Sequence, residues 1–414
     1  MLALYACGGA GGDGGEGPST GPSPIDAPDS AKSADGSAHT DAGVDGSASL
    51  DASLDAPTDA DAMVGDAAQG MPAVRFVGRF DTTPAAGPMV GFPGAQIIAR
   101  FSGTEVKATF ADTMVYSDWG PSRWEVILDG TSLTVLSLAR AQTTYTVATG
   151  LPMGTHTVEL FRLTEGIVGV SQFMGFEFPG GALLAPPPAP ARHLEFLGDS
   201  ASNGYGIEGV NPCPFTSATE NAHVSYPALI AHDLAADHHN LSAAGEGLLW
   251  NYTRGDPDVY SVFYQRAVPF TAASVWSFAD YTPDVVWMTL GGNDWSQPNP
   301  ADPPPTLAAF EAKYEDMVTL VRSKHPNAHF ICAVAPSLGD GYPVGYDAYT
   351  NVKTAVNDVV SAHAAAGDTK IYAFEFTRSQ GADVTGCQSH PNAMKHRAMA
   401  NEAIVLIKSK TGWL

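Results

Sequence analysis

Two patterns of hydrophobic and polar residues divide the chain, and a proline-rich stretch separates them. Between residues 72 and 184, apolar and polar residues alternate in short runs such as "EVKATF", "WEVILDG" and "HTVELFRL", which Gly, Asp and Pro separate. Alternation with a period of two is typical of strands that bury one face, and short strands at regular spacing predict a β-sandwich. We therefore expect an N-terminal all-β sandwich, jelly-roll-like, over residues 72–184.

The pattern changes after "APPPAPA" at residues 185–191, which predicts a stiff polyproline connector. From residue 192 to residue 414, solid apolar runs such as "VVWMTL", "FICAVA" and "IYAFEF" alternate with segments of helical periodicity. Solid apolar runs suit strands that are covered on both faces, and their alternation with helices predicts a mainly parallel sheet. The sequence thus predicts a three-layer α/β domain over residues 192–414.

Residues 1–71 have a third character. From residue 8 onward they are mostly Gly, Ala, Ser, Asp and Pro without an aromatic residue, a composition that predicts a disordered acidic tether. The start "MLALYACGG" is similar to the tail of a bacterial lipoprotein signal, with Cys7 as the lipidated residue. We therefore expect an exported protein, either a cell-surface or outer-membrane lipoprotein or a secreted one.

The charge of the chain narrows its partners. The formal net charge is −23, and a chain this acidic is repelled by phosphate backbones, so nucleic acid is not an expected partner. The sequence holds no run of about 18 apolar residues, so membrane contact is expected only through the N-terminal lipid. We expect a monomer.

The stretch "HLEFLGDSASNGYGIEG" allows two interpretations. Gly204, Gly206 and Gly209 spell the G-x-G-x-x-G of a dinucleotide site, whereas Ser200 directly follows the predicted strand and suits a nucleophile. A dinucleotide fingerprint needs its first glycine at the turn from strand to helix, and here the glycines come too late. The nucleophile interpretation is favoured.

A nucleophile needs partners at the carboxyl ends of neighbouring strands. Gly245 in "NLSAAGEG" follows a predicted second strand, Asn293 in "GGND" follows the "VVWMTL" strand, and His390 in "CQSHPN" precedes the last helix. Each residue alone has an ordinary structural explanation as a turn, a helix cap or an idle histidine. Their joint occurrence at strand ends favours one shared site.

This ordered set of Ser200, Gly245, Asn293 and His390 resembles the four blocks of the SGNH or GDSL-like hydrolases. An upstream β-sandwich with the phrases "FVGRF", "CPFTSATENAHVSYP" and "GEGLLWNY" is similar to the second family of carbohydrate esterases, which includes acetyl xylan esterases. The resemblance covers residues 72–414. It implies a serine esterase that removes O-acetyl groups from polysaccharide of the xylan or mannan type, without metal or cofactor.

The chemistry of these residues fits the resemblance. His390 can take the proton of the Ser200 hydroxyl, because an imidazole titrates near neutral pH. The backbone N–H groups of Ser200 and Gly245 and the Asn293 amide can donate to the oxyanion that attack on an ester creates. The expected pathway runs through an acyl-enzyme that water resolves.

The third member of a triad is the point where this sequence departs from its relatives. Many SGNH enzymes carry Asp three residues before the histidine, where this chain has Cys387, and the carbohydrate esterases commonly carry it two before, where this chain has Gln388. Asp383 lies farther back. We predict a Ser200–His390 dyad, with the imidazole oriented by a main-chain carbonyl or by Gln388.

Two further sets of residues complete the expectations. If Ser200 and His390 converge, Cys213 and Cys387 come together as well, and export permits a disulfide between them. Trp295, Trp250 and Tyr252 follow the blocks and are candidate sugar platforms, although core packing explains them equally well. The alternatives are an esterase or lipase on lipids or small acyl esters, and a non-catalytic polysaccharide-binding lipoprotein.

Overall fold

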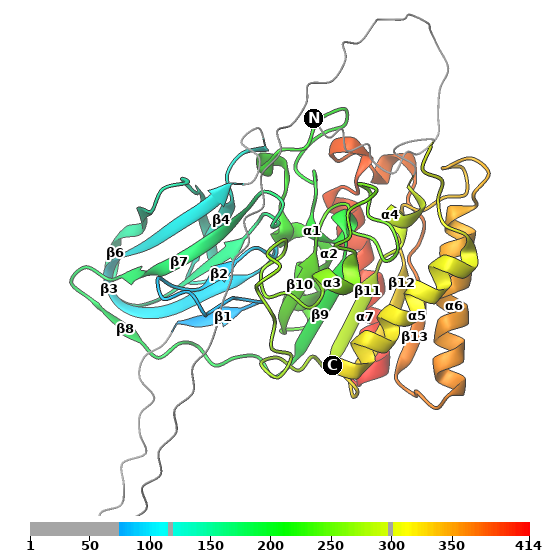
Figure 1. Cartoon of the computed structure of the whole chain (residues 1–414). Coiled ribbons are helices and arrows are strands. Elements are labelled where there is room, and N and C mark those ends of the chain that lie inside the picture. The colour runs from blue at the N-terminus through cyan, green and yellow to red at the C-terminus, as the bar shows by residue number, and fades with distance from the viewer. Residues whose placement is uncertain (1–73, 115–118, 297–300) are drawn as a thin grey trace, which may run out of the picture. The chain divides into compact units, whose positions relative to one another are not determined.

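The N-terminal region is an antiparallel sheet of eight strands. The computed structural model describes residues 74–114, 119–296 and 301–414, all within one compact unit, so the predicted tether and Cys7 lie outside the described residues. The strands are β1 (Arg75–Val77), β2 (Met89–Val90), β3 (Gln96–Met114), β4 (Arg123–Leu128), β5 (Thr131–Ser137), β6 (Thr143–Arg162), β7 (Gly169–Glu177) and β8 (Ala182–Leu184). The main path is β2-β7-β3-β6-β4-β5, with β1 and β8 paired to β3 (Figure 1).

The two long strands β3 and β6 organise this region. They pair along most of their length, and register shifts near Gly103 and Val106 bend them. Alternate residues of β3, β4, β6 and β7 meet in one apolar cluster that includes Phe101, Phe110 and Trp124, so the curved sheet encloses its own core. The β4–β5 hairpin turns at Asp129-Gly130, where both residues have positive φ, as a two-residue I′ turn requires.

The second region is a five-stranded parallel sheet in the order β10-β9-β11-β12-β13. Its strands are β9 (His193–Gly198), β10 (Asp237–Ser242), β11 (Val285–Thr289), β12 (His329–Val334) and β13 (Ile371–Glu375). The helices are α1 (Ser200–Asn203), α2 (Tyr226–Asp233), α3 (Tyr260–Phe263), α4 (Gly292–Trp295), α5 (Leu307–Lys324), α6 (Ala348–Ala365) and α7 (Ala393–Thr411). Residues 185–191 form neither helix nor strand.

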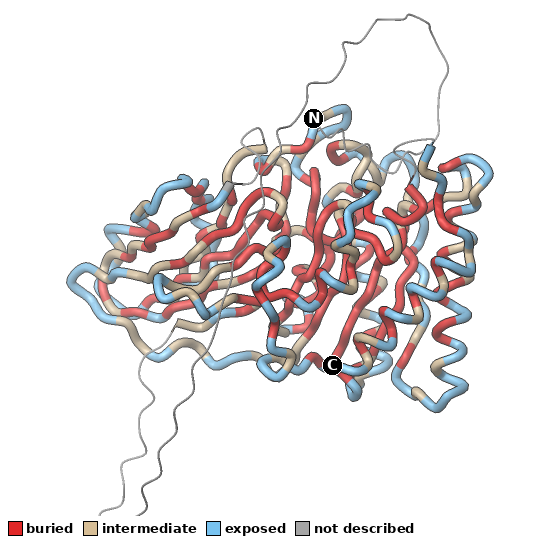
Figure 2. Tube along the Cα trace, viewed as in Figure 1, coloured by how far each residue is buried: buried red, intermediate tan, exposed pale blue. Residues whose placement is uncertain are grey.

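Helices cover both faces of the parallel sheet. On one face α5 and α6 pack together over side chains such as Met288 and Phe330, and on the other α2 and α7 pack over side chains such as Phe196 and Trp287. Figure 2 shows the central strands buried along their length between these two layers. The solid apolar runs of the sequence are explained by this double coverage.

The edge strand β10 reads "DHHNLS" and is nevertheless buried at five of its six positions. The N-terminal region covers this edge: the Arg75 guanidinium pairs with Asp237 at 2.7 Å, and Arg79 reaches the fully buried Glu195 on β9 at 3.1 Å. Burial raises the pKa of a carboxyl, but the charge of Arg79 and the nearby His325 and His239 lower the pKa of Glu195 to about 2. The two regions are thus joined by buried charge as well as by apolar contact.

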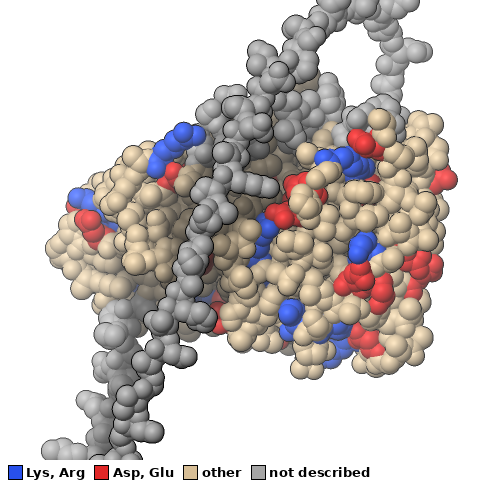
Figure 3. Space-filling view, viewed as in Figure 1, with Lys and Arg blue, Asp and Glu red and all other residues tan. Residues whose placement is uncertain are grey.

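The predicted fold class, an antiparallel β region followed by a parallel α/β domain, is confirmed. Among the helices of the described ranges, none is both long and apolar enough to cross a membrane. Figure 3 shows the face that is turned toward the viewer in Figure 1. Uncharged residues make up most of the described surface on this face, and lysine and arginine form small, separate patches.

Candidate active site

Ser200 stands at the carboxyl end of β9, one of the inner strands. The strand ends at Gly198, Asp199 caps α1 by accepting the Ala201 N–H at 2.9 Å, and Ser200 is the first residue of that helix. The Ser200 side chain is half-buried. Within the described chain, neither its hydroxyl nor its backbone N–H has a hydrogen-bond partner, so both are available to a ligand.

The Asn293 side chain connects the Gly245 loop with the turn that carries Ser200. Asn293, on α4 directly after β11, is buried and donates from Nδ2 to the Glu246 carbonyl at 2.8 Å and to Asp199 Oδ2 at 3.3 Å. Gly245, the residue before Glu246, has φ +85°, a left-handed conformation that favours glycine. Its N–H has no acceptor among the described residues. The structure therefore gathers Ser200, Gly245 and Asn293 at one edge of the sheet.

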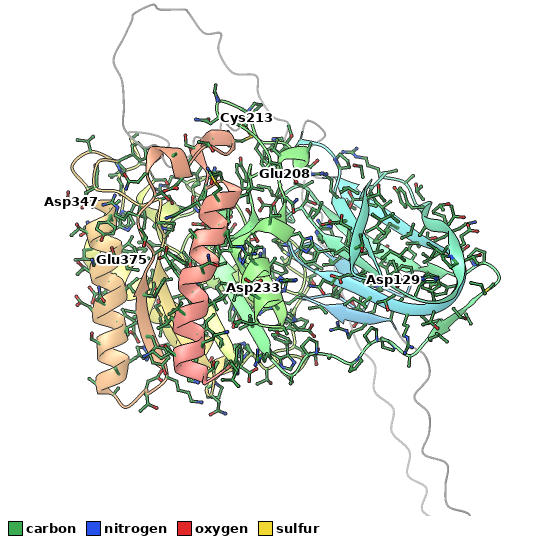
Figure 4. All side chains as sticks on the ribbon, turned by 180° about the vertical axis from the view of Figure 1, so that it is seen from behind. Asp129, Glu208, Cys213, Asp233, Asp347 and Glu375 are labelled. Carbon is green, nitrogen blue, oxygen red and sulfur yellow. A yellow bond between two sulfur atoms is a disulfide. The ribbon has the colours of Figure 1, made fainter. Side chains whose placement is uncertain are left out.

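His390 approaches the same edge from the loop before α7. Its ring lies 4.4 Å from the ring of Tyr205, which belongs to the turn after α1, and the Cys387 N–H donates to the Gly206 carbonyl at 2.9 Å. A disulfide joins Cys387 to Cys213, with a Cα–Cα distance of 4.8 Å. Figure 4 shows Cys213 and Glu208, both from the segment after α1, at the same end of the structure.

Of the groups predicted to orient His390, a main-chain carbonyl is the one that contacts the imidazole. The imidazole Nδ1 lies 3.1 Å from the Cys387 carbonyl oxygen, so a main-chain carbonyl takes the place of the missing acid. The Gln388 side chain accepts instead from the Tyr205 hydroxyl at 2.6 Å, and the Asp383 carboxylate accepts the Gln380 N–H at 2.8 Å. Among the described residues there is no hydrogen bond between the Ser200 hydroxyl and the His390 ring, so their pairing stays a prediction.

Burial shifts the ionisation of the site. It lowers the pKa of His390 to about 4, and the carbonyls of Cys387 and Gln388 offset only part of this effect. Burial, together with the charge of Asp294, raises the pKa of Asp199 to about 7, against the stabilising Ala201 N–H. The imidazole is therefore neutral at neutral pH, which is the state a general base requires.

The three residues predicted to stack on sugar, Trp295, Tyr252 and Trp250, differ in how far their side chains are exposed. Trp295 is wrong as a substrate contact: it is 2% exposed and packs in the core against Phe310, because α4 turns its side chain away from the surface. Tyr252 is also buried, with its Cβ beside Gly245. Trp250 is 40% exposed and remains a candidate platform.

Sequence reasoning missed the residues that hold these loops in place. The buried carboxylate of Asp294 accepts the N–H groups of three consecutive residues, Leu248 at 3.0 Å, Leu249 at 2.6 Å and Trp250 at 3.0 Å. Asp294 stands next to Asn293 in "GGND", so this adjacency was the available signal. Tyr205, which stacks on Phe215 at 4.0 Å as well as lying against His390, had no signal in the sequence.

Comparison with known proteins agrees with this architecture. A model described as the N-terminal region of carbohydrate esterase 2 matches residues 76–188, and a model of the GDSL-like lipase/acylhydrolase family matches residues 196–398. The chain is 33% identical over 343 residues to the cellulase/esterase CelE of Acetivibrio thermocellus, an alignment that covers 83% of this chain but 40% of that protein. It thus spans less than half the length of that curated relative.

Two further relatives match over most of their own length. An acetylxylan esterase/glucomannan deacetylase of Cellvibrio japonicus is 26% identical over 350 residues, which is 83% of this chain and 90% of that protein. A solved structure of a family two carbohydrate esterase from Clostridium thermocellum, in complex with cellohexaose, superposes with a TM-score of 0.75 at 32% identity. That alignment covers 83% of this chain and 100% of the other. The chain therefore belongs to the second family of carbohydrate esterases.

Proposed function

We propose that this chain is a serine esterase that removes O-acetyl groups from polysaccharide of the xylan or mannan type. The observation that carries the proposal is the Asn293 side chain, which ties the Ser200 turn to the Gly245 loop beside two unused backbone donors. The family supports ester hydrolysis. The relative named an acetylxylan esterase/glucomannan deacetylase supports the choice of acetylated xylan or mannan.

The proposed reaction begins with the Ser200 hydroxyl, which attacks the ester carbonyl while His390 Nε2 takes its proton. The imidazolium that forms is stabilised by the Cys387 carbonyl, which accepts from Nδ1. The tetrahedral intermediate collapses, the sugar hydroxyl leaves with the proton from His390, and an acetyl group remains on Ser200. Water, deprotonated by His390, then releases acetate.

The Ser200 and Gly245 N–H groups and the Asn293 amide are proposed to bind the oxyanion. Oxyanion donors are worth roughly 3–4 kcal/mol each in the clearest cases. Both Nδ2 hydrogens of Asn293 are engaged in this structure, and the longer bond, at 3.3 Å to Asp199, is the one we expect substrate to replace. Burial of the site strengthens each of these bonds.

The acid side of the pH profile follows from the lowered pKa of His390. A general base works only when it is neutral, so activity rises as the pH passes upward through the pKa of the base. Because burial brings that pKa to about 4, the acid midpoint of kcat/KM should lie well below the ordinary histidine value of 6.5. A pH series with a soluble acetyl ester measures it, and a midpoint at or above 6.5 would contradict the proposed environment.

Export is part of the proposal. A disulfide between Cys213 and Cys387 persists in oxidising compartments and is rare in the cytosol, so it supports a secreted or surface-anchored protein. The Cys7 lipid anchor remains a proposal of the sequence. Acetylated plant-type polysaccharides are large and are met outside the cell, which agrees with this placement.

A second candidate is the binding of unsubstituted β-glucan in the same site. The solved relative in complex with cellohexaose favours it, and the exposed indole of Trp250 offers a flat face on which a sugar ring can stack. Such binding would be compatible with ester hydrolysis. It would replace hydrolysis only if the Ser200 hydroxyl proved inert.

The test is acetate release from acetylated xylan and acetylated glucomannan, with the Ser200→Ala variant as the blank. We expect release by the native protein only. A parallel series of p-nitrophenyl esters of increasing acyl length should show a preference for acetate; a preference for long chains would support a lipase instead. Retention on cellulose without acetate release would support the binding function and overturn the esterase.

A further inference from the structure

A glutamate from the N-terminal β region reaches into the edge of the parallel sheet where the site lies. Glu165 stands in the loop between β6 and β7 and is fully buried. Its Oε2 accepts the backbone N–H of Ala244 at 2.7 Å, across 79 positions of sequence. Ala244 directly precedes Gly245, so the bond lies one residue from a proposed oxyanion donor.

The same carboxyl also faces the Ser200 side of the site. Asn203, the last residue of α1, is fully buried and lies close enough to Glu165 to lower the pKa of that carboxyl. Among the described residues, neither Asn203 Nδ2 nor Glu165 Oε1 has a hydrogen-bond partner. Glu165 therefore stands between the helix that begins with Ser200 and the loop that carries Gly245.

The loop that carries Glu165 is firmly seated. The Leu163 carbonyl accepts the Ala222 N–H at 3.0 Å, and the Glu165 N–H donates to the buried Glu220 carboxyl at 3.1 Å. Val168, at the end of the loop, belongs to one apolar cluster with Tyr205, Phe215 and Ala244. Because the backbone of this loop is fixed by these bonds and contacts, the Glu165 side chain can hold the Ala244 backbone in one place.

We propose that Glu165 is a positioning residue of the esterase, whose carboxyl holds the Ala244 backbone so that the Gly245 N–H points at the oxyanion. The inference rests on the proposed function, because it assigns a role toward Gly245. It goes beyond that function by making the N-terminal region a contributor to turnover. Without the bond, the Gly245 loop would lose its fixed orientation, and misplacement of about 1 Å is enough to slow a reaction strongly.

The charges around Glu165 give a readout that a purely structural residue would lack. Arg162 on β6, Glu220 and Asp199 before α1 carry the charges nearest to it, and the Ala244 N–H donates to it. Tyr205, Glu246 and Asn203 also lie near the carboxyl. Burial outweighs these contacts and raises the pKa of Glu165 above its ordinary value. The carboxyl therefore stays neutral to a higher pH than a free glutamate does, and once it ionises its negative charge opposes the developing oxyanion.

The test compares Glu165→Ala and Glu165→Gln, with Glu159→Ala as a matched control on the preceding strand. With a soluble acetyl ester, Glu165→Ala should lower kcat by roughly 10- to 100-fold and change KM little, because the oxyanion forms only in the transition state. Glu165→Gln keeps an acceptor for the Ala244 N–H and should retain most activity at neutral pH. It should also remove the fall in kcat at alkaline pH that we expect of the native protein when Glu165 ionises.

Several outcomes separate this inference from the proposed function. If the native protein releases acetate and Ser200→Ala does not, but Glu165→Ala matches Glu159→Ala, the positioning role is overturned and the esterase stands. If the native protein releases no acetate, both fail. Hydrogen exchange separates the positioning role from a loss of folding. If the role is correct, the Glu165→Ala variant should exchange faster only in the peptide that contains Ala244. Faster exchange throughout the Glu165→Ala variant, together with an inactive Glu165→Gln variant, would overturn the positioning role.

Discussion

Alanine at Ser200, at His390 or at both positions should leave the same residual rate of ester hydrolysis. Each single change should lower kcat on the order of 10⁴-fold, because the hydroxyl and the imidazole act as one unit and neither works without the other. The double variant should be no slower than either single variant. Since the structure shows His390 bonded to a carbonyl and not to Ser200, this lack of additivity is the direct test of their pairing.

Two controls accompany the double variant. Asp383→Asn should change kcat little, because that carboxylate caps the turn at Gln380 and makes no contact with the imidazole. His363→Ala removes a histidine on α6 that pairs with Glu315, and it should leave turnover intact. Rate losses that multiply in the double variant, or an Asp383 variant as slow as the His390 variant, would contradict the proposed dyad.

Replacing Arg79 by methionine should destabilise the fold by roughly 3–5 kcal/mol, because it leaves Glu195 buried and without its cation. Both side chains of this pair are completely buried. The Glu195 carboxylate also accepts the Tyr264 hydroxyl at 2.9 Å, and it lies 3.3 Å from His325 Nε2 and 4.0 Å from His239 Nδ1. Urea unfolding measures the change. The double variant Arg79→Met/Glu195→Leu should recover part of the loss, since a matched apolar pair removes the stranded charge.

The control for this change is Lys313→Met, which breaks an exposed pair with Asp316 and should have almost no effect on stability. The pH dependence has a definite sign. The pKa of Glu195 is about 2 in the folded chain and 4.5 as a free group, so its contribution is fully present above about 4.5 and is lost as the pH falls toward 2. An Arg79 variant as stable as the Lys313 variant would refute the argument.

The parts of the fold that repeat a simple pattern were predictable from the sequence. The runs "VVWMTL" and "FICAVA" became the inner strands β11 and β12, because both faces of the sheet are covered and nearly every position in these runs is apolar. The positions Ser200, Gly245 and Asn293 were predictable for a related reason. Chemistry-bearing residues that follow parallel strands fall at one edge of the sheet.

The remaining features depend on contacts distant in sequence, which no local pattern reports. The strand "DHHNLS" looks too polar for burial until the N-terminal region is placed over it. Trp295 looks like a sugar platform until α4 directs it into the core. The carbonyl that orients His390 carries no side-chain signal at all, and Glu165 is one glutamate among many until Ala244 lies beside it.

The Pro-rich segment at residues 185–191 offers an inviting place to cut the gene when only the hydrolytic half is wanted. Such a shortened polypeptide would expose the edge strand β10 with its histidines and asparagine. It would also leave the buried Glu195 without Arg79, and the Ala244 loop beside Ser200 without Glu165. Open margins of this kind invite self-association. For engineering, we therefore expect the two regions within residues 74–414 to fold and work best when they are kept, exchanged or evolved together.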